Sequence, residues 1–317
     1  MSNAAIKRLG LSFFILYCVT SAALQVAPDS PGTTMSARTI QGYLMIVSAR
    51  INDQGPFDFL VDTGTNSTLI DPALAKQLAL PAKDKLRLSS LAKSAAVSRY
   101  FLQKFNVGPA SVSNLEALAV PLTQLAALDH KIRGVLGMNF LLQFSFRLDF
   151  DHQLMELYPF PEEAIIPAGL RVPVTINESR LLVTVASKAA PQGSWKLALD
   201  SGICQALVFE QRMEKRIIVA SRFANNTRMM QVSTNLAEHM ASTVELKDLS
   251  IAETRLPQME VVVLKNDLQK SSDPQDGLLP AVAFHSVFFD RSNGTLILGP
   301  SPEGMTVARK SDIHGIF

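Results

Sequence analysis

The chain has 317 residues, of which 47% are hydrophobic and 18% carry a charged side chain. This length and composition allow two buried cores and exclude a chain that is disordered over most of its length. Lysine and arginine number 30 against 28 acidic residues. No basic stripe interleaved with aromatics stands out, so we expect no nucleic-acid partner.

The amino-terminal segment has the pattern of a secretory signal. Lys7-Arg8 precedes an almost wholly apolar stretch from Leu9 to Val19, and the small residues Ser21-Ala22-Ala23 follow. We therefore expect a cleaved signal peptide over residues 1–24 and a mature protein that is secreted or periplasmic. The alternative is an uncleaved anchor, because apolar character continues past the small residues. A membrane contact is expected only in that case.

The first half of the mature chain begins with a predicted hairpin. Tyr43 to Ile51 and Phe57 to Val61 are apolar and β-branched runs separated by turn residues. The second run ends at Asp62-Thr63-Gly64, and a short helix is predicted to begin at Asp71-Pro72. Further along lies Gly134-Val135-Leu136-Gly137, two apolar residues between glycines.

The second half repeats this plan. Leu44 to Arg50 aligns with Leu182 to Lys188, and the alignment continues without a gap until Asp62 meets the Asp200 of Asp200-Ser201-Gly202. An internal repeat of about 140 residues is therefore the basic plan. The simpler alternative for each triplet is an aspartate that caps a turn after a strand. We predict an amino-terminal lobe over residues 39–159, a proline-rich linker over 160–173 and a carboxy-terminal lobe over 174–300.

The sequence lacks the motifs that mark other catalytic classes. The sequence has no HExxH, GxSxG or CxxC motif, and its histidines are scattered without ligand spacing. We therefore expect no metal and no other cofactor. Cys204 is the one cysteine outside the expected signal peptide, so an intramolecular disulfide is excluded in the mature chain.

A strand that ends in Asp-Thr/Ser-Gly and is followed later by glycine-flanked apolar residues resembles the retropepsin-like and pepsin-like aspartic proteases. The resemblance covers most of the mature chain. It implies a mostly β fold of two tandem retropepsin-like (acid-protease) β-barrel lobes related by a pseudo-two-fold axis. It also implies a monomeric aspartic endopeptidase that acts on a peptide or protein substrate.

The resemblance assigns the catalytic roles to Asp62 and Asp200, since two facing carboxylates that share one proton can activate a water and polarise a carbonyl. The hydroxyls of the triplets would form a reciprocal network under the carboxylates, and the glycines would permit tight turns and close backbone approach. A flap hairpin would fall between about Leu86 and Phe105. The supporting residues are Thr63, Gly64, Thr65, Ser201, Gly202, Gly134 and Gly137.

The second copy departs from the first at two positions. Ile203 stands where the first copy has the hydroxyl of Thr65, and Pro280 follows Leu278-Leu279 where a glycine is expected. Two alternatives therefore stay open: a non-catalytic peptide-binding module, and a homodimer that pairs Asp62 from two chains. Because Ile203 offers no hydroxyl to an ionised neighbour, we expect Asp200 to hold the shared proton and Asp62 to act as the base.

Overall fold

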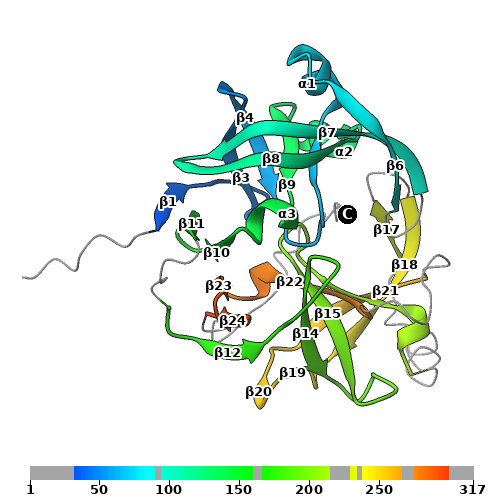
Figure 1. Ribbon diagram of the computed structural model, residues 1–317. Helices are drawn as coiled ribbons and strands as arrows, with labels where there is room; N and C mark the ends of the chain where they lie inside the picture. The colour runs from blue at the N-terminus through cyan, green and yellow to red at the C-terminus, as the bar shows by residue number, and fades with distance from the viewer. Residues whose placement is uncertain are drawn as a thin grey trace, which may run out of the picture. The chain divides into compact units, whose positions relative to one another are not determined.

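The computed structural model describes residues 32–89, 94–159, 166–214, 229–233, 238–265 and 275–299. Strands dominate this part of the chain and form three sheets (Figure 1), so the predicted mostly β fold is confirmed. The expected signal peptide, residues 1–24, lies outside the described residues. Within the ranges described, no helix is long and apolar enough to cross a membrane.

The first sheet has eight strands and carries the first aspartate loop at the end of β4. Strands β3 and β4 form the predicted hairpin, with Ile46 opposite Leu60. Helix α1 begins as predicted, because the Asp71 carboxylate accepts a 2.6 Å hydrogen bond from the Ala73 N–H. In spatial order the strands are β2 (Arg38–Ile40), β3 (Leu44–Ile51), β4 (Gln54–Val61), β9 (Ile132–Leu136), β5 (Thr68–Ile70), β8 (Ala110–Ala119), β7 (Ser94–Val107) and β6 (Ala82–Ser89). The helices are α1 (Pro72–Gln77), α2 (Thr123–Leu128) and α3 (Met138–Leu141).

The second sheet carries the second aspartate loop, and β15 ends at Asp200 itself. In spatial order its strands are β17 (Met229–Ser233), β18 (Glu238–Leu246), β21 (Met259–Leu264), β16 (Ala206–Phe209), β22 (Gly277–Pro280), β15 (Ser194–Asp200), β14 (Arg180–Ala186), β19 (Ser250–Ile251) and β20 (Thr254–Arg255), with β13 (Thr175–Asn177) paired to β14. Two 3₁₀ turns accompany them, η1 (Glu210–Arg212) and η2 (Ala281–Ala283).

The strands around the two aspartates are paired in the same way. In the first half, β4 pairs in parallel with β9, β9 pairs antiparallel with β5, and β5 pairs in parallel with β8. In the second half, β15, β22, β16 and β21 make the same three pairings in the same order. The sequence repeat is thus also a repeat of local topology, and each aspartate follows a strand held by the glycine-containing strand.

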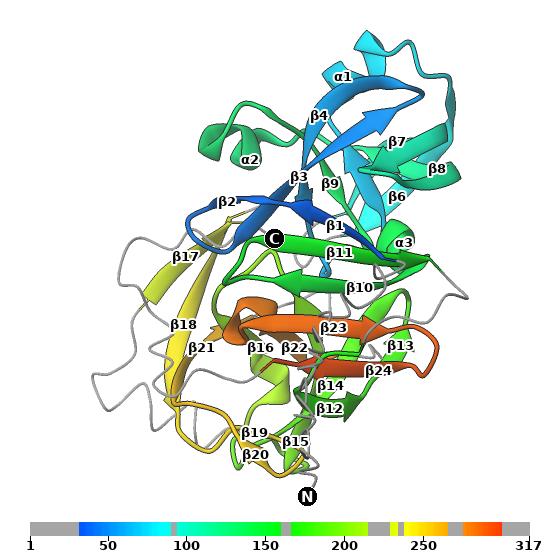
Figure 2. The ribbon, with the colours of Figure 1, turned by 90° about the vertical axis from the view of Figure 1, so that its left-hand side faces the viewer.

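The third sheet joins the two halves. Figure 2 shows its face, with the strands in the order β1 (Thr33–Ser36), β11 (Leu154–Pro159), β10 (Phe144–Asp149), β23 (Ser286–Asp290), β24 (Thr295–Leu298) and β12 (Leu170–Pro173). Phe146 of the first half lies opposite Phe289 of the second, with ring centroids 5.6 Å apart. Strands β1 and β12 lie outside the predicted lobes, whose boundaries stay a prediction.

A row of aromatic rings fills the core beneath the first aspartate loop. Phe59, Phe105, Phe140 and Phe144 are buried and contact one another in sequence, with centroids 5.2, 5.4 and 5.2 Å apart. Burying each ring contributes roughly 1.5–3 kcal/mol. Because Phe59 lies on β4 and Phe140 on α3, this packing fixes the strand that precedes Asp62.

Candidate active site

Two loops, one after β4 and one after β15, are joined by four reciprocal hydrogen bonds. The Thr63 hydroxyl donates to the Leu199 carbonyl (2.9 Å) and accepts from the Ser201 N–H (3.0 Å). The Ser201 hydroxyl donates to the Val61 carbonyl (2.9 Å) and accepts from the Thr63 N–H (3.1 Å). Both side chains are buried. Each hydroxyl therefore satisfies two backbone groups of the opposite loop.

This network brings the carboxyl groups of Asp62 and Asp200 together, close enough for each to affect the pKa of the other. Asp62 also accepts from the Gly64 N–H (2.8 Å) and from the Thr65 hydroxyl (2.6 Å). Asp200 accepts from the Gly202 N–H (2.7 Å). Asp200 is only 5% exposed, whereas Asp62 is partly exposed. The pair is thus asymmetric in its access to solvent.

Glycine is required in both loops by the approach of the opposite carboxyl group. A Cβ atom on Gly64 would lie 2.3 Å from a carboxyl oxygen of Asp200. A Cβ atom on Gly202 would lie 3.2 Å from the carboxyl carbon of Asp62. Any side chain at position 64 would therefore displace Asp200, and one at 202 would press on Asp62.

Burial raises the pKa of both carboxyl groups, but not equally. The pKa of Asp200 lies well above its ordinary value because burial, the negative charge of Asp62 and the hydrogen bond to Asp62 all favour its protonated form. Burial also raises the pKa of Asp62, but the hydrogen bonds from Thr65 and Gly64 oppose that rise. These effects favour the protonated form more strongly at Asp200 than at Asp62.

The glycine-flanked strands pass close to the aspartate loops. A Cβ atom on Gly134 would lie 2.1 Å from the Phe59 ring, and one on Gly137 would lie 2.4 Å from the Ser67 carbonyl oxygen. In the second half, a Cβ atom on Gly277 would lie 2.0 Å from the Leu207 carbonyl oxygen. At Gly134, Gly137 and Gly277, neighbouring backbone atoms or the Phe59 ring leave no room for a side chain.

Pro280 stands where the first half has its second glycine. In the first half the Gly137 N–H lies 3.4 Å from the Thr68 hydroxyl. The repeat aligns Thr68 with Ala206. The second half therefore lacks both partners of this contact: Pro280 has no N–H, and Ala206 has no hydroxyl. The helix α3 of the first half is replaced by the 3₁₀ turn η2. The change is confined to this corner of the second half.

Three residues near the pair were missed by the sequence reasoning. Cys204 packs against the apolar cluster that contains Tyr43, and the Tyr43 hydroxyl donates to the Gln41 side-chain oxygen at 3.3 Å. Burial raises the pKa of Cys204 to about 11, with Tyr43 opposing the rise, and burial and the charge of Asp200 both raise the pKa of Tyr43. The third residue is Arg180, whose positive charge acts on Asp200. No motif marks any of them, because each reaches the pair through tertiary contacts.

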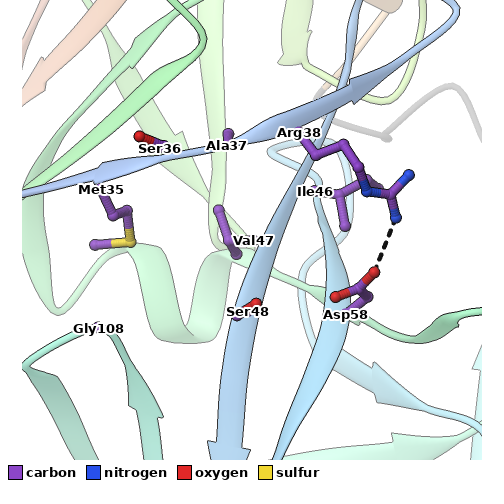
Figure 3. A pocket seen from close by; sticks show the side chains of 9 residues that line it. All are labelled: Met35, Ser36, Ala37, Arg38, Ile46, Val47, Ser48, Asp58 and Gly108. Atoms are coloured by element: carbon purple, nitrogen blue, oxygen red, sulfur yellow. Dashed lines mark hydrogen bonds and ion pairs between the residues drawn. The ribbon is translucent and has the colours of Figure 1, made fainter.

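A cavity of about 430 Å³ lies away from the pair (Figure 3). Arg38 lines this cavity, and its guanidinium forms ion pairs with Asp58 and Asp129 at 2.8 Å each. None of its lining residues belongs to an aspartate loop: Met35, Ser36, Ala37, Arg38, Ile46, Val47, Ser48, Asp58 and Gly108. Within the part of the chain that the structure describes, no three His, Cys, Asp or Glu side chains are placed to hold a metal ion.

The predicted flap corresponds to a hairpin of the first sheet. Strands β6 and β7 pair antiparallel, with Leu86 opposite Val97, and β7 continues through Phe105. The tip of this hairpin, residues 90–93, lies outside the described residues. Whether the hairpin covers substrate stays a prediction.

Comparison with known proteins finds a family match in part of the chain. Residues 47–140 match a family model for aspartyl proteases, and this range includes both Asp62-Thr63-Gly64 and the glycine-flanked strand at Gly134 to Gly137. The predicted resemblance to aspartyl proteases is therefore confirmed for this segment of the chain.

The chain is also similar to the crystal structure of a retropepsin-like aspartic protease from Rickettsia conorii. The two share 21% sequence identity over 40% of this chain and 92% of the other, with a TM-score of 0.30. No curated protein matches the chain.

Proposed function

We propose that the protein is an aspartic endopeptidase whose catalytic pair is Asp62 and Asp200 of one chain. The observation that carries this proposal is the juxtaposition of the two carboxyl groups, held together by the reciprocal hydrogen bonds of Thr63 and Ser201. Placing two acids side by side costs desolvation and repulsion, so such pairs are typical of functional sites.

The asymmetry of the pair supports a division of roles. Ionised and partly exposed, Asp62 would take a proton from a bound water as that water attacks the peptide carbonyl. Protonated Asp200 would give its proton to the carbonyl oxygen, so that a neutral gem-diol forms. Asp62 would then pass its proton to the leaving nitrogen while Asp200 recovers one from the diol, which breaks the C–N bond and restores both groups.

The repeated topology supports two tandem lobes related by a pseudo-two-fold axis, each contributing one aspartate. The same three strand pairings surround both loops, and the hydrogen bonds between the loops are reciprocal. The homodimer alternative is disfavoured because the partner of Asp62 is Asp200 of the same chain. The non-catalytic alternative rests on Ile203 and Pro280. The second of these changes is matched by Ala206, which lacks the hydroxyl that the Gly137 N–H contacts in the first half.

Cleavage of a denatured protein at mildly acidic pH tests the proposal. Asp62→Asn and Asp200→Asn should each abolish cleavage while circular dichroism shows an intact fold. Asp58→Asn is the matched control, since Asp58 lies on the same strand as the residues before Asp62 but pairs with Arg38 at the surface. Full activity of Asp200→Asn beside an inactive Asp62→Asn would favour the homodimer. Peptide binding by a wild-type protein that cleaves nothing would favour the binding module.

A further inference from the structure

One asparagine side chain of α3 joins three elements around the first aspartate loop. The Asn139 Oδ1 atom accepts hydrogen bonds from the Thr68 N–H and from the Thr68 hydroxyl, both at 2.8 Å. Its Nδ2 atom donates to the Glu116 carbonyl oxygen of β8, also at 2.8 Å. A side-chain amide can accept and donate at the same time, which a carboxylate or an apolar side chain cannot. Asn139 therefore ties the start of β5 to α3 and to β8.

The backbone at the start of α3 holds the other end of the same loop. The Met138 N–H donates to the Thr65 carbonyl oxygen at 2.8 Å. The Asn139 N–H donates to the Asn66 carbonyl oxygen at 3.0 Å. The Thr65 hydroxyl in turn donates to Asp62 at 2.6 Å. Hydrogen bonds between oxygen atoms span a narrow range of lengths, roughly 2.5–3.0 Å, so a small displacement of this loop weakens the bond to Asp62.

The second half of the chain lacks this arrangement. Three polar positions of the first half are apolar in the second, and the pairs are Thr65 with Ile203, Thr68 with Ala206 and Asn139 with Val282. The last pair follows from the elements, since Asn139 is the second residue of α3 and Val282 is the second residue of η2. Val282 packs against apolar clusters instead. The asparagine and the hydroxyl are thus present together in one half and absent together in the other.

This joint absence argues against a purely structural asparagine. The two halves share the strand pairings around their aspartate loops, so the fold of these strands does not require the amide. What the second half lacks together with the amide is a hydroxyl donor to its aspartate. At Asp62 the Thr65 hydrogen bond is the largest effect that opposes the rise of the pKa through burial. The asparagine therefore accompanies the donor that favours ionised Asp62.

We propose that Asn139 is a positioning residue for the reaction, which holds the Thr65 hydroxyl against Asp62 so that Asp62 stays ionised and accepts the proton of the attacking water; this rests on the proposed endopeptidase function. Asn139 acts through the loop, which it anchors with its side chain at Thr68 and with its backbone at Asn66. Removing the amide frees the Thr68 end of the loop and weakens the bond between Thr65 and Asp62. Asp62 then needs a higher pH to ionise.

The acid limb of the pH profile separates positioning from stability. That limb of kcat/KM reports the group that must be ionised in the free enzyme. An asparagine that only stabilised the fold would change the free energy of unfolding and leave the limb where it is. A positioning asparagine moves the limb upward when it is replaced, in the same direction as Thr65→Val. Because both variants lose the same hydrogen bond to Asp62, their effects on the limb should not add in the double variant.

The experiment measures kcat/KM against pH for one peptide substrate. Asn139→Leu removes the amide and keeps its branched shape. We expect its acid limb to lie about 0.5–1 unit above that of the wild type, which corresponds to about a three- to tenfold loss of kcat/KM on the acid side. The double variant with Thr65→Val should show the limb of Thr65→Val alone. Gln143→Leu is the matched control, because the Gln143 amide donates to the backbone carbonyl of Asn139 at 3.3 Å. Its limb should stay in place.

Thr68→Val is a second variant, which carries the test if Asn139→Leu does not fold. It removes the hydroxyl that donates to Asn139 and leaves the Thr68 N–H bound to the same oxygen atom. We expect a smaller upward shift of the acid limb, about 0.5 unit. Circular dichroism and urea denaturation establish for each variant that the fold is intact.

The outcomes separate this inference from the function on which it rests. An acid limb that stays within about 0.3 unit of the wild type in folded Asn139→Leu, or in Thr68→Val where only that variant folds, would overturn the inference and leave the proposed function standing. Shifts of Asn139→Leu and Thr65→Val that add in full would do the same, because the two residues would then act independently. A wild type that cleaves neither peptides nor denatured protein would overturn both.

Discussion

The hydroxyl of Thr65 offers the sharpest test of how the two carboxyl groups differ. It donates a 2.6 Å hydrogen bond to Asp62, while the matching position beside Asp200 is the buried Ile203. Thr65→Val removes this donor and keeps the shape of the side chain. Because the hydrogen bond favours ionised Asp62, its loss should raise the pKa of that carboxyl group.

The magnitude follows from the strength of such bonds. A hydrogen bond to a charged group contributes roughly 1.5–3 kcal/mol, and 1.36 kcal/mol corresponds to one pKa unit. Asp62 keeps the Gly64 N–H as a second donor and is partly exposed. We therefore take the lower part of this range and expect a shift of about one unit.

The assay is the pH profile of kcat/KM on one peptide substrate. Its acid limb reports the group that must be ionised, so Thr65→Val should move that limb upward by about one unit. Ile203→Thr is the reciprocal variant: it offers a donor to ionised Asp200, lowers the pKa of that group and should move the basic limb downward. Ile203→Val, which adds no donor, controls for packing.

An acid limb that stays within about 0.3 unit of the wild type in Thr65→Val would refute this reasoning. So would a change confined to the basic limb, because it would assign the proton to Asp62. Apparent pKa values belong to the coupled pair, so the direction of each limb is the quantity to compare.

Three further predictions concern stability and processing. Thr63→Val should lower the free energy of unfolding by about 2–5 kcal/mol, since it leaves two buried backbone groups unpaired, whereas Thr63→Ser should lower it far less; urea denaturation measures both, and equal losses would contradict the role of the hydroxyl. Asp200→Asn should stabilise the fold more at pH 7 than at pH 4. The folded state keeps a proton that the unfolded chain releases above pKa 3.8. The wild type therefore loses stability as the pH rises from about 3.8 towards the raised pKa of folded Asp200. A stability difference between Asp200→Asn and the wild type that shrinks as the pH rises would contradict the raised pKa. The mature chain should begin between about Ala22 and Pro28 and be found outside the cytosol; sequencing of its amino terminus decides this, and a detergent-extracted chain that begins at Met1 would indicate an anchor.

Local patterns in the sequence predicted the part of the site that lies within each repeat. The hairpin of β3 and β4 and the start of α1 depend on residues close in the chain. The correspondence of Asp62 with Asp200 follows from the local pattern around each aspartate. Turn residues, an N-cap and apolar runs suffice to identify such features. The family resemblance supplied the pairing of Thr63 with Ser201, which lie 138 positions apart.

The surroundings of the pair could not be predicted because they depend on register and on contacts between halves. The repeat aligns Leu44 with Leu182, which leaves Arg180 aligned with Gly42 and gives it no signal. Only the paired strands reveal that the two hairpins differ in register by two residues. Tyr43 and Cys204 likewise meet across the halves.

The short edge strands β1 and β12 could not be predicted from the sequence, for a different reason. Strand β1 has four residues and lies in a stretch that reads as polar, and β12 ends at a proline within the predicted linker. Four residues are too few to establish a period of two, and proline is tolerated at a sheet edge. The sheet that joins the two halves could therefore not be predicted from the sequence, although its inner strands are apolar.

The central claim is that one chain forms one complete catalytic pair, and inhibitor stoichiometry tests it most directly. A statine-type peptide, whose hydroxyl imitates the tetrahedral intermediate, is titrated calorimetrically into the mature protein at mildly acidic pH. We predict one inhibitor bound per chain and a loss of binding in both Asp62→Asn and Asp200→Asn. One inhibitor per two chains, or binding that survives Asp200→Asn, would contradict the claim.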